Sequence, residues 1–161
     1  MEYTNVELSS DFEHRYKFDA GLYNIWKNTF EDVVIFLDSG CFNTMIPRHF
    51  AVESGHSLGF KRGYRIGGSV IEAEAFSIDR IMIQNVVLER VVAFAAEFTG
   101  ELESNILIGT NVMNNWEMVI HKKTHVFKFR EDPPENLPNK AHIYQNYFDN
   151  SGNYVCVQNV D

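Results

Sequence analysis

Short apolar segments, separated by turn-forming residues, recur along this sequence and restrict its fold more than any other feature. The chain holds 13 Phe, 7 Tyr and 2 Trp, and aromatic residues favour strands over helices. Short strands at this spacing are typical of a compact, mainly-β barrel or sandwich. The expected strands are Arg15–Trp26, Val33–Leu37, Tyr64–Ile66, Val70–Ile78, Ile81–Ile83, Val86–Ala95, Ile106–Ile108, Met118–His121 and His125–Phe129.

Turn and helix signals lie between these segments. Gly67-Gly68 predicts a two-residue hairpin, because both glycines tolerate a positive φ angle. Lys122-Lys123-Thr124 predicts a second hairpin. Helix signals are few: Thr110-Asn111 predicts the cap of a short helix that runs through Trp116. Pro47–Ser54 predicts a further turn of helix with its proline in the first position.

Size and charge exclude several classes of protein. A chain of 161 residues, 45% hydrophobic and 22% charged, predicts one globular domain with its own core. Cys41 and Cys156 are too few and too far apart for a disulfide framework. A net charge of −8 repels phosphate backbones, so we expect no nucleic acid as a partner. Without a signal-peptide pattern, or an apolar run near the roughly 20 residues that span a bilayer, we expect a cytoplasmic protein with no membrane partner.

The C-terminal part of the sequence differs from the rest. Glu131–Lys140 contains three of the four prolines and is typical of a linker. Ala141–Phe148 and Tyr154–Val160 then flank a polar turn and predict a terminal hairpin, which is too short to be stable alone. We therefore divide the chain into a domain at 1–130 and an extension at 131–161. The hairpin either adds strands to a subunit interface or lies near a cleft as a regulatory or self-processing segment.

One buried strand ends in a group that can carry chemistry. Val33–Leu37 is a continuous apolar run, and Asp38-Ser39-Gly40 follows it directly. A carboxylate at the edge of a core is costly to ionise unless partners stabilise it. Asp-Ser-Gly alone is also common as a simple turn. Some seventy residues later, Ile106–Ile108 and Gly109 form a second apolar strand that ends in glycine.

The order of these elements resembles the retropepsin-like, or retroviral-type, aspartic peptidases. That order is an apolar strand with Asp-Ser-Gly, a glycine-tipped hairpin, further strands, an apolar-apolar-Gly element and a short helix. The resemblance covers roughly Val33 to Phe129. It implies a closed β-barrel of the acid protease fold, with one or two short helices. It also implies an aspartic endopeptidase that hydrolyses a polypeptide substrate and needs no cofactor or metal.

The resemblance assigns roles to individual residues. Asp38 matches the catalytic carboxylate, and Ser39 and Gly40 complete the catalytic tripeptide. Leu107-Ile108-Gly109 matches the element that packs behind the catalytic loop. The substrate-binding residues that it implies are Cys41, Met45, Ile66, Gly67, Gly68 and Leu107, among which Gly67-Gly68 is the tip of the flap and Met45, Ile66 and Leu107 are candidate walls of apolar pockets or ordinary core residues.

The chemistry requires two carboxylates that share a proton, and this chain has a single Asp-Ser-Gly. We therefore expect a homodimer in which each subunit contributes one Asp38 to a site on the twofold axis. His121 and His125 flank a predicted turn, but they lack further ligands at metal-binding spacing, so we expect solvated histidines. Cys41 has no histidine in a recognisable motif and is expected to be a partly buried thiol.

Two departures from the family pattern leave alternatives open. Thr110 stands where many relatives carry an arginine that supports the catalytic loop, and Phe42-Asn43 replaces a more acidic or polar pair. A non-catalytic protein-binding module on the same fold is therefore the main alternative. A small-ligand-binding β-barrel unrelated to peptidases is the other.

Overall fold

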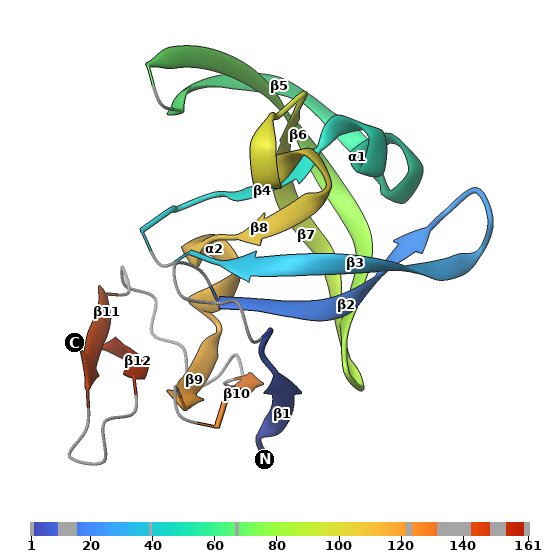
Figure 1. Ribbon diagram of the computed structural model, residues 1–161. Helices are drawn as coiled ribbons and strands as arrows, with labels where there is room; N and C mark the ends of the chain where they lie inside the picture. Colours follow the sequence, from blue (N-terminus) through green and yellow to red (C-terminus); the bar gives the residue numbers. More distant parts are fainter. Residues whose placement is uncertain are drawn as a thin grey trace.

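The computed structural model describes residues 2–9, 16–38, 40–66, 68–121, 124–131, 143–148 and 154–159, and its chain is mainly β (Figure 1). Within these ranges, two short helices and one 3-10 turn, Gly100–Glu103, interrupt the strands. The elements are β1 Thr4–Glu7, β2 Tyr16–Asn24, β3 Thr29–Leu37, β4 Thr44–Pro47, α1 Arg48–Ser54, β5 Gly55–Ile66, β6 Ser69–Ile83, β7 Val86–Ala96, β8 Asn105–Ile108, α2 Thr110–Met113, β9 Trp116–His121, β10 Val126–Glu131, β11 Ile143–Phe148 and β12 Tyr154–Asn159.

The larger sheet has seven strands in the order β2-β3-β8-β4-β7-β6-β5. Strand β2 also pairs with β6, where Gly21 lies opposite Met82 and Leu22 opposite Ile81, so the sheet curls back on itself. Two of its pairings are parallel, β3 with β8 and β4 with β7. The parallel pairing of β3 with β8 brings the ends of these two strands to the same edge, and this edge carries the candidate site.

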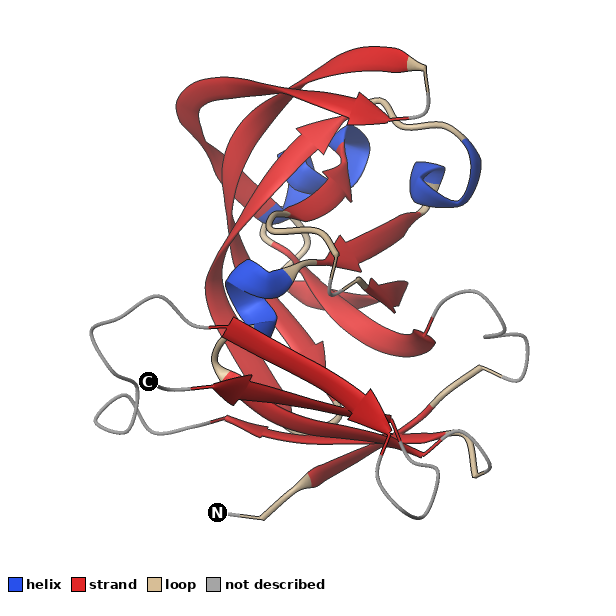
Figure 2. Ribbon diagram, turned by 90° about the vertical axis from the view of Figure 1, so that its left-hand side faces the viewer, coloured by secondary structure: helices blue, strands red, loops and turns tan. Residues whose placement is uncertain are grey.

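The smaller sheet has five strands in the order β1-β10-β9-β12-β11 and lies below the larger sheet in Figure 2. Its neighbours pair antiparallel throughout. Trp116, Phe127 and Phe129 from β9 and β10 are fully buried. The Trp116 and Phe129 ring centroids are 4.6 Å apart, so large aromatic side chains supply much of the apolar surface between the sheets.

A second, smaller apolar cluster lies beside this main core. It contains Met45, Phe94 and Leu107, together with alanines of β6 and β7. Because β4, β7 and β8 each contribute to it, this cluster supports the strands that lead to and from the candidate site.

Most predicted strands are confirmed within a few residues at their ends. The two-residue hairpin is confirmed as well, because Ile66 pairs with Ser69 across it. The segments predicted at Val70–Ile78 and Ile81–Ile83 form one long strand, β6. Its central Asp79 and Arg80 pair with each other at the surface, so the polar interruption does not end the strand.

The helix predictions need two corrections. Gly109, and not Thr110, is the N-cap of α2. The helix ends at Met113 and does not reach Trp116, because Trp116 begins β9 and packs into the core. Pro47 is the N-cap residue of α1 and the last residue of β4, and thus not the first residue of the helix.

The predicted C-terminal hairpin is present. Strands β11 and β12 pair antiparallel, and β12 also pairs with β9 through Tyr154–Ile120, Val155–Val119 and Cys156–Met118. The predicted linker, apart from Glu131 at the end of β10, lies outside the described residues. The boundary between a domain at 1–130 and an extension at 131–161 stays a prediction.

Over the part of the chain that the structure describes, no helix is both long and apolar enough to cross a membrane.

Candidate active site

Asp38 directly follows β3 and is held by β8. Its backbone N–H donates to the Ile108 carbonyl at 3.0 Å, which continues the parallel pairing of the two strands by one bond. The side chain is half-buried, and its Oδ1 accepts a hydrogen bond from the Gly40 backbone N–H at 2.9 Å. This bond orients the carboxylate within its own turn. Ser39, the second residue of the predicted tripeptide, lies outside the described residues.

The Gly109 segment packs directly against the loop that carries Asp38. The Thr110 N–H donates to the Cys41 carbonyl at 2.8 Å, and the Asn111 N–H donates to the Phe42 carbonyl at 2.9 Å. A Cβ atom on Gly109 would lie 2.5 Å from the Asn43 carbonyl oxygen, closer than real Cβ contacts allow. The structure thus brings the two distant glycine motifs into backbone contact, and this contact requires glycine at position 109.

A network of polar side chains also holds the Asp38 loop in place. The Gly109 N–H donates to Thr44 Oγ1 at 3.2 Å, and that hydroxyl donates to Asn111 Oδ1 at 2.8 Å. Asn111 Nδ2 in turn donates to the Val92 carbonyl on β7 at 2.8 Å. Thr110, at the position where the sequence resemblance would predict an arginine, contributes through its backbone N–H. Sequence reasoning did not find the role of Asn111, because its side-chain partner lies 67 residues away.

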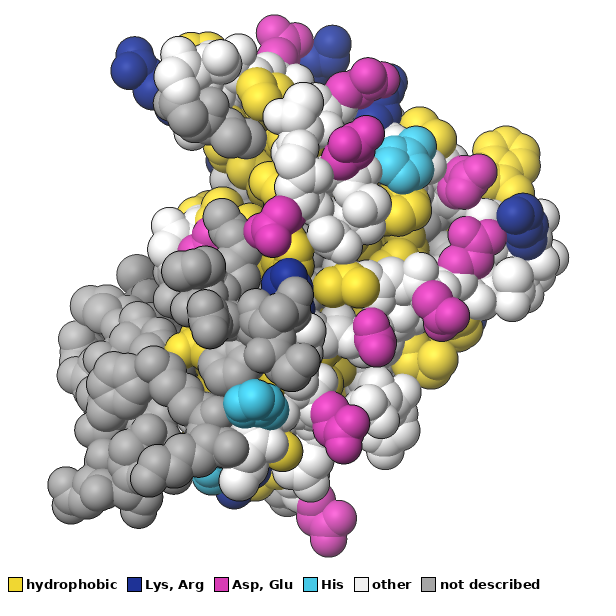
Figure 3. Space-filling model, in the orientation of Figure 1, with side chains coloured by type: hydrophobic (Ala, Val, Ile, Leu, Met, Phe, Trp, Pro, Cys, Tyr) yellow, Lys and Arg dark blue, Asp and Glu magenta, His cyan; other side chains and the backbone are white. Residues whose placement is uncertain are grey.

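The β5–β6 hairpin lies above this loop, and the surface between them is hollowed on the left of Figure 3. Asn43 Nδ2 donates to the Tyr64 hydroxyl at 2.6 Å and so connects the loop to β5 close to the hairpin tip. Burial raises the pKa of the Tyr64 hydroxyl, and the Arg62 charge opposes that shift. Sequence reasoning missed Tyr64, since a single tyrosine in a strand carries no motif.

The tip residues of the hairpin are described in part. Gly68 is exposed, and an added Cβ there would meet nothing within 4 Å. Gly67 and the Ile66 side chain lie outside the described parts, so their predicted roles at the substrate stay predictions.

Met45 and Leu107 lie opposite each other on β4 and β8, and each is only 5% exposed. Both pack into the smaller apolar cluster with Phe94. In the single chain they are core residues, and their predicted role as pocket walls stays a prediction.

Cys41 is half-buried, as expected, and its Sγ donates to the Asn43 carbonyl at 3.1 Å. Burial raises the pKa of the thiol, the hydrogen bond lowers it, and the nearby Asp38 charge raises it further. The net rise favours the neutral thiol over the nucleophilic thiolate.

The histidines near the second predicted hairpin are not directly opposite each other in the strand register. In the register of β9 and β10, His121 lies opposite Val126 and not opposite His125. Across the described ranges, three or more His, Cys, Asp or Glu side chains nowhere come together as a group that could hold a metal ion.

Comparisons with known proteins support the fold. No protein-family model and no curated protein matches this chain. Among solved structures, the crystal structure of a retropepsin-like aspartic protease from Rickettsia conorii matches it with a TM-score of 0.54. The match covers 80% of this chain and 91% of that chain, at 12% sequence identity. The mainly-β architecture of this chain is therefore a retropepsin-like fold.

Proposed function

We propose that this protein is an aspartic endopeptidase that acts as a homodimer, with one Asp38 from each subunit in a shared site. One observation carries the proposal: the Asp38 loop is locked against Gly109 and lies beneath a glycine-tipped hairpin, in a chain with a retropepsin-like fold. Each part of this arrangement has a use in peptide hydrolysis.

The reaction needs one ionised and one protonated carboxylate. Two carboxylates about 3 Å apart cannot both ionise easily, so the pair of Asp38 side chains would share a proton. The ionised member accepts a proton from the attacking water, while the protonated member polarises the scissile carbonyl. Activity is therefore expected to be highest at mildly acidic pH, where the singly protonated pair is the dominant form.

Neighbouring residues would orient the carboxylates and the substrate. The Gly40 N–H already holds Asp38 Oδ1, and Ser39 would bond across the twofold axis to the partner loop. The substrate would lie extended beneath the Gly67-Gly68 hairpin and exchange main-chain hydrogen bonds with it. Cys41 would lie beside the substrate backbone, and Met45, Ile66 and Leu107 would face apolar substrate side chains.

The homodimer follows from the number of carboxylates. The chain supplies one Asp-Ser-Gly loop, so a single subunit holds half of the required pair. A twofold axis beside this loop would supply the second carboxylate from another copy of the same chain. Sedimentation velocity tests this requirement, since peptidase activity in a strictly monomeric protein would contradict it.

The test of the reaction is cleavage of a mixed peptide library at pH values from about 4 to 7. Asp38→Asn is expected to abolish cleavage while the circular dichroism spectrum and the dimer persist, because the amide cannot serve as the base. Asp32→Asn is the matched control: it removes an exposed carboxylate on β3, the strand that leads to Asp38, and cleavage should continue at the wild-type rate. Cleavage that survives Asp38→Asn, or peptide binding without any turnover, would refute the proposed function.

A further inference from the structure

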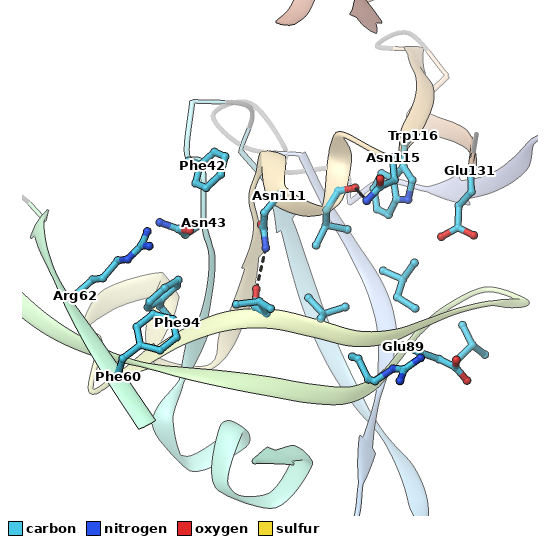
Figure 4. Close-up of a pocket in the computed structure, with 16 residues that line it drawn as sticks. Phe42, Asn43, Phe60, Arg62, Glu89, Phe94, Asn111, Asn115, Trp116 and Glu131 are labelled. Atoms are coloured by element: carbon cyan, nitrogen blue, oxygen red, sulfur yellow. Dashed lines mark hydrogen bonds between the residues drawn. The ribbon is translucent and has the colours of Figure 1, made fainter. Parts of the chain in front are cut away.

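A groove of about 600 Å³ starts beside the catalytic loop and runs along β7 to the smaller sheet (Figure 4). Its volume lies within the range of about 300–1,000 Å³ that is usual for ligand sites. Phe42 and Asn43, which line its near end, come directly after the Asp38–Cys41 turn. Asn43 also bonds to Tyr64 beneath the hairpin, so the groove continues outward from the proposed substrate cleft.

The near end of the groove is aromatic and positively charged. Phe60, Phe94 and Arg62 lie together there in Figure 4. The Arg62 guanidinium lies 5.5 Å from the Phe94 ring centroid and 5.9 Å from that of Phe60. These contacts hold the cation at the boundary between cleft and groove, where it can contact a carbonyl or carboxylate of a bound chain.

The β7 strand provides an exposed apolar surface along the groove. Val87 and Val92 both line it, and each is 41% exposed. Asn111 lies midway along the groove, where its amide bonds to the Val92 carbonyl. Apolar side chains that alternate with polar groups along an elongated groove fit an extended polypeptide better than a compact ligand.

The far end of the groove carries charged groups beside a buried indole. Trp116 is fully buried, and among the described residues its indole N–H has no hydrogen-bond partner that meets normal geometry. Glu131 and Glu89 lie at this end in Figure 4, and Arg90, which follows Glu89 in the sequence, also lines the groove. Partial burial raises the pKa of the Glu131 carboxyl, and the nearby Trp116 indole opposes the shift.

We propose that this groove binds the part of a polypeptide substrate that continues beyond the cleaved bond, with apolar side chains on β7 and a basic side chain between Glu89 and Glu131. The inference rests on the proposed function, because it assigns the groove to the same substrate. At the far end the carboxylates of Glu89 and Glu131 outnumber the guanidinium of Arg90, and this excess of negative charge favours the basic side chain. The net charge of −8 on the whole protein favours such a substrate at longer range.

The test compares two fluorescein-labelled peptides that share the best-cleaved library sequence. One ends close to the cleaved bond, and the other extends by about eight residues on each side, with a lysine in its flanks. Their dissociation constants are measured by fluorescence anisotropy with Asp38→Asn protein, which is expected to bind peptide without cleaving it. If the library yields no cleaved sequence, the long peptide is instead selected by binding to the wild-type protein.

Glu131→Gln is expected to weaken binding of the long peptide about three- to tenfold and to leave the short peptide unchanged. Val92→Asp, which places a charge on the exposed floor of the groove, should weaken binding of the long peptide at least as much. Asp32→Asn and Val52→Asp are the matched controls, because they change exposed positions on β3 and α1 that do not line the groove. In the active protein, Glu131→Gln should raise KM for the long peptide without changing kcat.

If Glu131→Gln and Val92→Asp weaken binding of both peptides equally, or of neither, the groove inference is overturned. Failure to detect any peptide that binds would overturn it as well. These results differ from failure of the proposed function, which appears as an absence of turnover by the wild-type protein. If the long peptide binds through the groove but is never cleaved, the groove inference stands and the proposed peptidase activity is refuted.

Discussion

Position 109 is where the candidate site has least room for a side chain. A Cβ at this position would meet backbone atoms, namely the carbonyl oxygens of Asn43 at 2.5 Å and of Cys41 at 2.6 Å. Gly109→Ala should therefore displace the Asp38 loop and lower the free energy of unfolding by about 2 kcal/mol or more. Urea unfolding followed by tryptophan fluorescence measures this change, and the peptide-cleavage assay should show a larger proportional loss.

Gly63→Ala is the matched control for that experiment. An added Cβ there meets only the Val70 side chain, at 3.7 Å, which is an ordinary contact. Its effect on the free energy of unfolding should stay within about 0.5 kcal/mol. If the two variants unfold at the same urea concentration, the close backbone contact at Gly109 does not exist, and the geometry of the candidate site is wrong.

The sequence located Asp38 and Gly109 at the ends of strands, because a strand end depends on immediate neighbours. The Asp38 and Gly109 motifs follow apolar strands, and strand ends can be recognised locally. The partnership of Thr44 with Asn111 could not be predicted, because a hydroxyl and an amide far apart in sequence carry no shared pattern. The sequence also could not decide whether Met45 and Leu107 line a substrate pocket or belong to the core, because both positions favour the same apolar residues.

Among the elements of the smaller sheet, a charged contact joins β9 and β10 to the residue that precedes β1. Tyr3 Oη donates to Glu117 Oε1 at 2.5 Å, and Arg130 Nε donates to Oε2 at 2.6 Å. Burial alone would raise the pKa of the Glu117 carboxyl, but these two bonds and the Arg130 charge together lower it. The lowered pKa means that the contact stabilises the fold only while Glu117 is ionised.

This contact predicts a pH-dependent effect of Glu117→Gln. The stabilisation is present above the unfolded-state pKa of about 4.3 and is lost as the pH falls through the lowered pKa of the folded state. At pH 7 the variant should lose about 1 kcal/mol of unfolding free energy, and the difference from wild type should shrink toward pH 3. Asp32→Asn makes the same change of charge and should not reproduce this pattern in urea titrations. A difference that is constant with pH would contradict the proposed contact.

Element boundaries were predictable where the apolar pattern alone decides them, and less so where packing intervenes. Asp79-Arg80 suggested a break, but Arg80 stacks on Tyr23 with its guanidinium 3.8 Å from the ring centroid and remains within β6. The helix expected to run through Trp116 ends at Met113, because burying the indole against Phe129 outweighs one more turn of helix. In both cases a distant aromatic residue determines the result, and its position is not encoded in the local pattern.

At the scale of the whole molecule, the position of the C-terminal hairpin bears on how two subunits would meet. The strand β12 pairs with β9, so the extension continues the five-stranded sheet. Of its two predicted roles, this position favours added strands at a subunit interface over a segment in the cleft. Without the hairpin, the β9 edge would expose unpaired backbone groups, which promote pairing with other chains.

Deletion of residues 132–161 tests this argument directly. The shortened chain should lose the dimer in sedimentation velocity and form larger, concentration-dependent species, because the freed β9 edge pairs without specificity. Hydrogen exchange at the backbone amides of β9 should become faster, while those of β3, which lies between β2 and β8, should keep their protection. An intact dimer with increased peptidase activity would instead place the extension over the cleft, where its removal admits substrate, and would show that its pairing with β9 does not build the interface.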